Sequence, residues 1–186
     1  MTTFFTDPKF TIETERLILR PPQVSDFSAL EEMAKDKETM RFIGGVSEPA
    51  MTWRTHAMLT GHWALRGYGF FSVIERESGN WMGRVGPWNP HLWPEPEVGW
   101  TITRPYWNQG FAREAAMASI NWTFEHLGWE QVTHMIDPAN TPSQALARSL
   151  GSKPLREIDE LPGFGKMKIV IWGQTRKQWQ ENFGDT

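Results

Sequence analysis

One stretch of this sequence places a glycine at the predicted start of a helix, and such a pairing can bind an anion. Gly110, Phe111 and Ala112 follow a short loop at residues 106–109, and apolar residues then recur at helical spacing as far as Leu127. The first amides of a helix have no partner within it and lie at the positive end of the helix macrodipole. Glycine lets a phosphate approach these amides without meeting a Cβ, but Gly-x-Ala is also typical of an ordinary strand-to-helix connection. Both interpretations fit the residues alone.

The strand that precedes this loop begins with a carboxylate. Residues 97–103 alternate in polarity, and Pro105 ends the strand because proline cannot donate to a sheet ladder. Glu97 is the first residue of the strand. A carboxylate can take a proton from an amine if burial raises its pKa toward neutrality, whereas an exposed glutamate at a strand end has no such role. We keep both interpretations of Glu97 open.

The loop, taken with its neighbours, resembles a known cofactor site. Its residues are Trp107, Asn108, Gln109, Gly110, Phe111 and Ala112. They resemble the acyl-CoA pyrophosphate loop of the GCN5-related N-acetyltransferases (GNAT), which runs Gln or Arg, two variable residues, Gly, one variable residue, and Gly or Ala. Trp107 departs from the Gln or Arg of that pattern. The longer pattern Tyr-Trp-x-x-Gly-x-Ala-x-Glu-Ala at residues 106–115 is similar to the RimJ/RimL-like branch of the family.

Other segments extend the resemblance over nearly the whole chain. Residues 14–20 resemble the opening strand of that branch, and residues 140–151 resemble its second cofactor segment. The resemblance implies an α+β fold in which helices flank a mixed, mainly antiparallel sheet that is splayed where the cofactor enters. It also implies transfer of acetyl from acetyl-CoA to a primary amine by direct attack in a ternary complex. A protein N-terminus and a small-molecule amine both fit as the acceptor.

The resemblance assigns roles to several further residues. A strand amide near Ile102 or Thr103 would stabilise the oxyanion, Asn140 would hydrogen-bond the pantetheine arm, and Ser143 would lie near the sulfur. Simple capping of a helix start is the alternative for Asn140 and Ser143. Many members of the family place a tyrosine as general acid where this sequence has Ala147. Ser143 or solvent is therefore expected to protonate the leaving thiolate.

Glu97 corresponds to a glutamate that acts through water as general base in some members of the family. A rival to the enzyme is a non-catalytic acyl-CoA-binding sensor or interaction module. Such a module keeps the Gly110 loop but needs neither Glu97 nor Ser143. A structural domain without a cofactor is a third interpretation, which the pattern at residues 106–115 disfavours.

Composition limits the other possibilities. The 186 residues, 39% of them hydrophobic, suffice for one well-packed domain, expected to span residues 1–186. A net charge of −3 argues against nucleic acid as a partner. The absence of cysteine excludes disulfides and thiolate catalysis, and the five histidines lack metal-ligand spacing, so no metal is expected. Without a secretory signal or an apolar run of membrane length, a cytoplasmic protein is expected, either monomer or homodimer.

Other elements must position these residues, and the sequence pattern predicts them along the chain. Strands are predicted at residues 15–20, 68–75, 81–85, 97–103, 131–136, 153–158 and 166–172. Helices are predicted from residue 25, at 51–65, from 110, at 141–150 and at 174–182. Ser25 and Thr141 are the predicted N-caps of two of these helices. Residues 39–48 and 87–96 are predicted loops.

Overall fold

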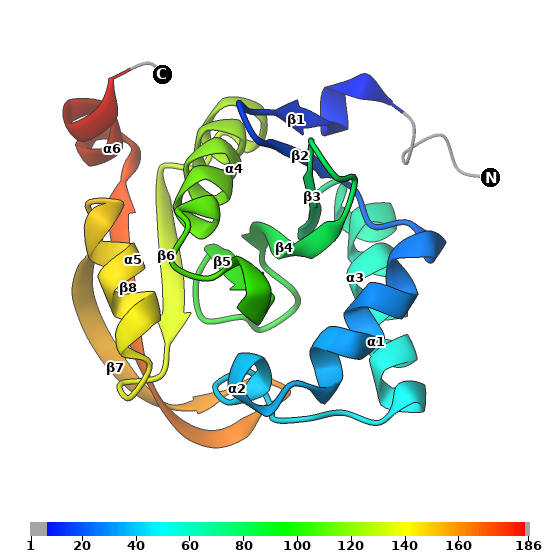
Figure 1. Cartoon of the computed structure of the whole chain (residues 1–186). Coiled ribbons are helices and arrows are strands. Elements are labelled where there is room, and N and C mark those ends of the chain that lie inside the picture. Colours follow the sequence, from blue (N-terminus) through cyan, green and yellow to red (C-terminus); the bar gives the residue numbers. More distant parts are fainter. Residues whose placement is uncertain (1–6, 185–186) are drawn as a thin grey trace.

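The computed structural model describes residues 7–184, and the strands in this part of the chain form one sheet (Figure 1). The strands are β1 (Ile12–Glu13), β2 (Leu17–Arg20), β3 (Phe71–Glu75), β4 (Trp81–Trp88), β5 (Glu97–Ile102), β6 (Gln131–Ile136), β7 (Lys153–Leu161) and β8 (Gly165–Thr175). Their order across the sheet is β1-β2-β3-β4-β5-β6-β8-β7. Neighbours are antiparallel except β5 and β6, which are parallel. The predicted mixed, mainly antiparallel sheet of an α+β fold is confirmed.

Helices lie on both faces of this sheet. They are α1 (Phe27–Lys35), α2 (Lys37–Met40), α3 (Pro49–Arg66), α4 (Phe111–Leu127), α5 (Thr141–Ser149) and α6 (Arg176–Phe183). Helix α4 packs on the face that carries Val85, Val98 and Ile102, and α5 contributes buried Ala147 to the core on that side. Helices α1 and α3 pack against each other and, as Figure 1 shows, lie apart from α5 and α6.

The parallel pair β5–β6 is where the sheet opens. A single residue pair, Glu97 with Thr133, joins the two strands within the described residues. By contrast, β4 and β5 stay paired from Trp88 and Glu97 to Gly83 and Ile102. Strand β5 therefore follows β4 for its whole length and leaves β6 after its first residue. This is the splayed geometry that the family resemblance implies.

Two predicted helix caps are each displaced by one residue. Helix α1 begins after Asp26 rather than after Ser25, and Asp26 turns its carboxylate to Arg20 instead of capping the helix. Helix α5 is capped by Asn140, whose Oδ1 accepts from the Ser143 amide at 3.2 Å, so that Thr141 is already helical. At α1, the ion pair of Asp26 with Arg20 outweighs the local preference for Ser as the cap. At α5, the competing cap by Asn140 outweighs the preference for Thr.

Strand β1 and helix α2, which overlaps the predicted loop at residues 39–48, are not predicted by the sequence pattern, and further differences are of length. Strand β4 extends into the predicted loop as far as Trp88, and β7 and β8 extend to Leu161 and from Gly165. Pro87 is accommodated because it lies beyond the end of β3 and opposite Val98, at a pair of β4 and β5 that exchanges no ladder hydrogen bonds.

Candidate active site

The loop before α4 holds its backbone in the left-handed region at two positions. Asn108 has φ +59° and Gly110 has φ +83°, and Gly110 is the N-cap of α4 without a capping side chain. The Trp107 indole donates from Nε1 to the carbonyl oxygen of Ile102 at 2.6 Å, and Gln109 donates from Nε2 to that of Pro105 at 2.8 Å. The first bond fixes the loop against the end of β5, and the second closes the connection between β5 and α4 on itself. The first amides of α4 remain free of side-chain caps, as an anion site requires.

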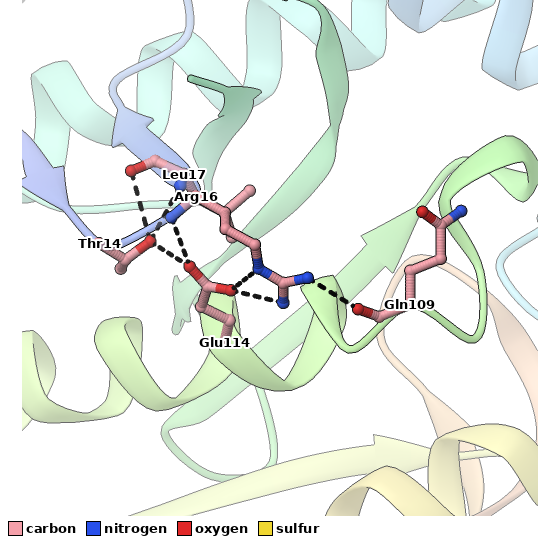
Figure 2. A network of polar contacts seen from close by, with 5 residues as sticks. All are labelled: Thr14, Arg16, Leu17, Gln109 and Glu114. Carbon is pink, nitrogen blue, oxygen red and sulfur yellow. Dashed lines mark hydrogen bonds and ion pairs between the residues drawn. The ribbon is translucent and has the colours of Figure 1, made fainter. Parts of the chain in front are cut away.

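A network of polar contacts anchors the same loop from the other side (Figure 2). Arg16 donates from Nη1 to the Gln109 carbonyl oxygen at 3.0 Å, and from Nε to Glu114 Oε2 at 2.7 Å. Glu114 also accepts from the hydroxyl of Thr14 at 2.6 Å and from the amide of Arg16 at 3.0 Å. Burial acts to raise the pKa of Glu114, but these hydrogen bonds and the Arg16 charge hold it below its ordinary value. The ionised pair therefore ties β2 to the start of α4.

The hydrogen bonds of β5 determine which backbone groups face the opening of the sheet. The amide of Thr103 donates to Met82 at 2.8 Å, so odd-numbered residues of this strand bond to β4 and even-numbered ones face β6. The N–H groups of Trp100 and Ile102 consequently face the opening, where β6 no longer pairs. The two residues expected near the oxyanion thus differ, since the amide of Thr103 is engaged in the sheet and the amide of Ile102 is not.

Helix α5 brings the predicted sulfur-side residues to this opening. Asn140 uses Oδ1 as the helix cap, as the capping interpretation predicts, and keeps its amide nitrogen for another acceptor. The hydroxyl of half-buried Ser143 accepts from Trp100 Nε1 at 3.3 Å. Ala147, at the expected tyrosine position, is completely buried. Ser143 is therefore the hydroxyl that α5 presents to β5 beside the free strand amides.

Glu97 lies on the opposite face of β5 and is 7% exposed, which excludes the exposed-glutamate interpretation. Its Oε1 accepts from the Met135 amide of β6 at 3.1 Å, and its Oε2 accepts from Trp93 Nε1 at 2.9 Å. Burial raises the pKa of Glu97 from 4.5 to about 7, although both hydrogen bonds and the charge of Arg84 act to lower it. A carboxyl group that titrates near neutral pH suits a general base.

His134 is 1% exposed and makes two hydrogen bonds, one of them across the opening of the sheet. Its Nδ1 lies 2.7 Å from the carbonyl oxygen of Val98, which can only accept, and its Nε2 lies 3.0 Å from Ser152 Oγ. Burial lowers the pKa of His134 to about 4. At neutral pH the ring is therefore uncharged and held in one tautomer, which leaves no free nitrogen for proton transfer. Its two hydrogen bonds give His134 a structural role.

This sequence and this fold are similar to those of known proteins. The sequence model of the acetyltransferase (GNAT) domain matches residues 16–153. The chain belongs to this family. The GNAT protein is accordingly an acyltransferase enzyme, and the strand-loop-helix at residues 97–127 falls within the matched region.

Relatives of this GNAT protein are similar to it over most of its length. The uncharacterized N-acetyltransferase p20 of Bacillus licheniformis is 28% identical over 164 residues, which cover 82% of this chain and 89% of p20. An acetyltransferase from Agrobacterium tumefaciens superimposes with a TM-score of 0.78 at 27% identity, covering 95% of this chain and 99% of its own. The ribosomal-protein acetyltransferase RimL has a TM-score of 0.74 at 12% identity, covering 89% and 93%, and so shares the fold.

The predicted site residues of the GNAT protein fall into two groups. The Gly110 loop, the Ile102 amide and Ser143 surround the opening on one face of β5, and Glu97 lies on the other face. Sequence reasoning did not identify Arg84, a half-buried cation in the middle of β4. The available signal is its position, since a charged residue between Gly83 and Val85 interrupts a strand that is otherwise mostly buried.

Within residues 7–184, no group of three or more His, Asp or Glu side chains is arranged to hold a metal ion. None of the helices in this part of the chain is both long and apolar enough to cross a membrane.

Proposed function

We propose that this enzyme transfers the acetyl group of acetyl-CoA to a primary amine by direct attack in a ternary complex. The observation that supports this proposal is the arrangement around β5. The start of α4 and the free amide of Ile102 lie by the opening of the sheet, and buried Glu97 lies on the other face of the same strand. GNAT acetyltransferases use acetyl-CoA as their cosubstrate, and the site has an anion-binding helix start suited to its pyrophosphate.

The proposed reaction assigns each proton to a residue. Glu97 takes a proton from the acceptor ammonium, directly or through water, and so frees the lone pair of the nitrogen. The nitrogen attacks the thioester carbonyl, a C–N bond forms, and the Ile102 amide stabilises the tetrahedral oxyanion. The C–S bond then breaks, and Ser143 Oγ or solvent gives the leaving thiolate its proton. The remaining catalysis comes from holding the two substrates together.

The finer assignments belong to the same proposal. Trp107, Asn108, Gln109, Gly110, Phe111 and Ala112 bind the pyrophosphate, Ile102, Thr103 and Asn140 line the pantetheine arm, and Ser143 lies at the sulfur. The whole chain forms one RimJ/RimL-like acetyltransferase, as the sequence pattern indicates. This enzyme acts in the cytoplasm. The acceptor is a protein N-terminus or a small-molecule amine, and monomer and homodimer both fit. Buried Glu97, with its raised pKa, disfavours the non-catalytic sensor, which would have no use for it.

A two-part experiment tests this function. Calorimetry measures the binding of acetyl-CoA, and a thiol-release assay then follows acetyl transfer to peptides with free N-termini and to small amines. N-terminally blocked peptides serve as the control. Binding together with amine-dependent thiol release supports the proposal. Tight binding without transfer to any amine favours the sensor, and the absence of acetyl-CoA binding overturns both.

A further inference from the structure

Arg84 is a half-buried cation on the same sheet face as Glu97, and the two charges act on each other without forming an ion pair. It lies in the middle of β4, on the sheet face that carries Glu97, and its side chain helps to line a small cavity beneath α1 and α3 with Ser72 and His56. Its Nε is shut off from solvent and has no hydrogen-bond partner. Within residues 7–184 its guanidinium forms no ion pair, and it lies over the ring of Phe70, 5.1 Å from the ring centroid.

Asp26, which lines this cavity, and Glu97, on the same sheet face as Arg84, are both hydrogen-bonded to other groups. Asp26 is bound by both terminal nitrogens of Arg20, at 2.8 and 2.7 Å, and accepts from Ser72 Oγ at 2.6 Å. Glu97 is held by Met135 and Trp93. The Phe70 ring, whose Cζ would lie 2.9 Å from a Cβ at Gly99, packs beside the Glu97 carboxylate.

A cation held partly out of water, with a buried N–H that has no acceptor, is costly unless a binding partner compensates it. Burial lowers the pKa of Arg84 to about 10, so the guanidinium stays charged at neutral pH. Cation–π contact with Phe70 offsets only part of the desolvation and leaves the Nε–H unused. The fork of donors on a guanidinium matches the two oxygens of a carboxylate. The Nε–H thus needs an acceptor that residues 7–184 do not supply.

We propose that Arg84 binds a carboxylate of the acceptor, so that the enzyme selects amines that also carry a carboxylate. This inference rests on the proposed function and adds the class of its acceptor. Glu97 on the same face receives the ammonium end of such an acceptor. A doubly charged phosphate suits the site less well, because the Glu97 carboxylate lies on the same face and repels the second negative charge.

The register of the sheet sets the spacing of the two charges on the acceptor. Arg84 pairs with Thr101, and Glu97 lies four residues along β5 from that position, which corresponds to roughly 13 Å of strand. The long arginine side chain shortens this gap, and the two charges act on each other without forming an ion pair. The acceptor therefore carries its carboxylate several bonds from the reacting nitrogen. The ε-amine of free lysine meets this condition, as does a peptide N-terminus followed by an acidic side chain.

The test compares acceptors that differ only in that carboxylate. One pair is lysine and lysinamide, and the other is the C-terminally amidated peptides Ala-Glu-Ala and Ala-Gln-Ala. For the wild type we expect kcat/KM to favour the carboxylate member of at least one pair by about 10-fold to 100-fold, the usual range for a hydrogen-bonded charge. The preferred pair distinguishes a small molecule from a peptide. Arg84→Gln should bring the ratio close to one, and Arg84→Lys should restore part of it.

Arg54→Gln is the matched control, because Arg54 is exposed on α3 and its loss changes the net charge equally. Its ratios should stay at the wild-type values. Equal kcat/KM for both members of both pairs in the wild type overturns the role of Arg84 while leaving amine acetylation intact, and this result does not depend on any variant folding. Failure of the wild type to acetylate any amine overturns the proposed function and the inference together.

Discussion

His134 Nδ1 of β6 lies 2.7 Å from the carbonyl oxygen of Val98 on β5, one residue beyond the point where the two strands stop pairing. The His134 side chain joins β6 to β5 here, where the backbones of the two strands no longer pair. On the other face of the sheet Glu97 Oε1 accepts from the Met135 amide, also across this boundary. The opening of the sheet is thus held from both faces by a buried titratable group, and the two groups respond to pH in opposite directions.

The free energy of unfolding should show these opposite responses. The pKa of Glu97 is raised by burial from 4.5 to about 7, so the folded state holds its proton more tightly and stability falls as pH rises through this range. The pKa of His134 is lowered from 6.5 to about 4, so the unfolded state binds the proton first and stability rises with pH between these values. Each group is worth about 3 kcal/mol over its range, and in the wild type the two nearly cancel.

Urea denaturation at several pH values separates the two contributions. The difference in unfolding free energy between wild type and Glu97→Gln should fall as pH rises from 4.5 to 7, and that between wild type and His134→Gln should rise from pH 4 to 6.5. Because only the slope of this difference against pH is compared, the pH-independent effect of each substitution on stability cancels. A difference that does not change with pH would show that the group titrates alike in the folded and unfolded states.

Glu97→Gln should also change the pH profile of catalysis. The side chain keeps its shape and loses the base, so kcat/KM should fall roughly 100-fold at neutral pH and recover in part at high pH, where the amine loses its proton unaided. Steady-state kinetics against pH, together with calorimetry showing unchanged acetyl-CoA affinity, make the measurement. An equal loss at every pH would assign Glu97 a structural role.

Gly110→Val should weaken acetyl-CoA binding by about 10-fold to 100-fold, because a β-branched residue at φ +83° displaces the helix-start amides and obstructs the pyrophosphate. Gly128→Val is the matched control at the other end of α4. It carries similar strain at φ +63°, and a Cβ there meets no atom within 4 Å. Calorimetry on both folded variants should find the loss only at Gly110, and equal affinities would remove the loop from the cofactor site.

Ser143→Ala should lower turnover by roughly 10-fold to 1,000-fold, the range for a general acid, while acetyl-CoA affinity changes little. Ser149→Ala on the same helix provides the control, because that hydroxyl is exposed and bonds only to the Leu146 carbonyl. Pre-steady-state and steady-state rates of thiol release give the comparison. Wild-type turnover in Ser143→Ala would leave solvent as the proton donor.

The features that the sequence does predict depend on neighbours along the chain. The β5 alternation, the glycine before α4 and the start of α5 to within one residue all follow from local backbone preferences. The features that the sequence does not predict depend on contacts between residues far apart along the chain. Arg16 meets Glu114 across 98 residues, and His134 meets Val98 across 36. Arg84 forms no ion pair with Asp26 because Asp26 is bound by Arg20, and no local pattern in the sequence reveals this.

The divergence of β6 from β5 also gives one strand two kinds of amide. The odd-numbered Gly99 and Thr101 bond to β4, whereas Trp100 and Ile102 face the opening without a ladder partner. Deuterium uptake along β5 should therefore alternate with a period of two, slow at odd positions and fast at even ones, although all four residues belong to the same strand. A pantetheine arm lying in the opening would slow the fast positions and make β5 uniformly protected, so that isotope exchange would record cofactor occupancy residue by residue.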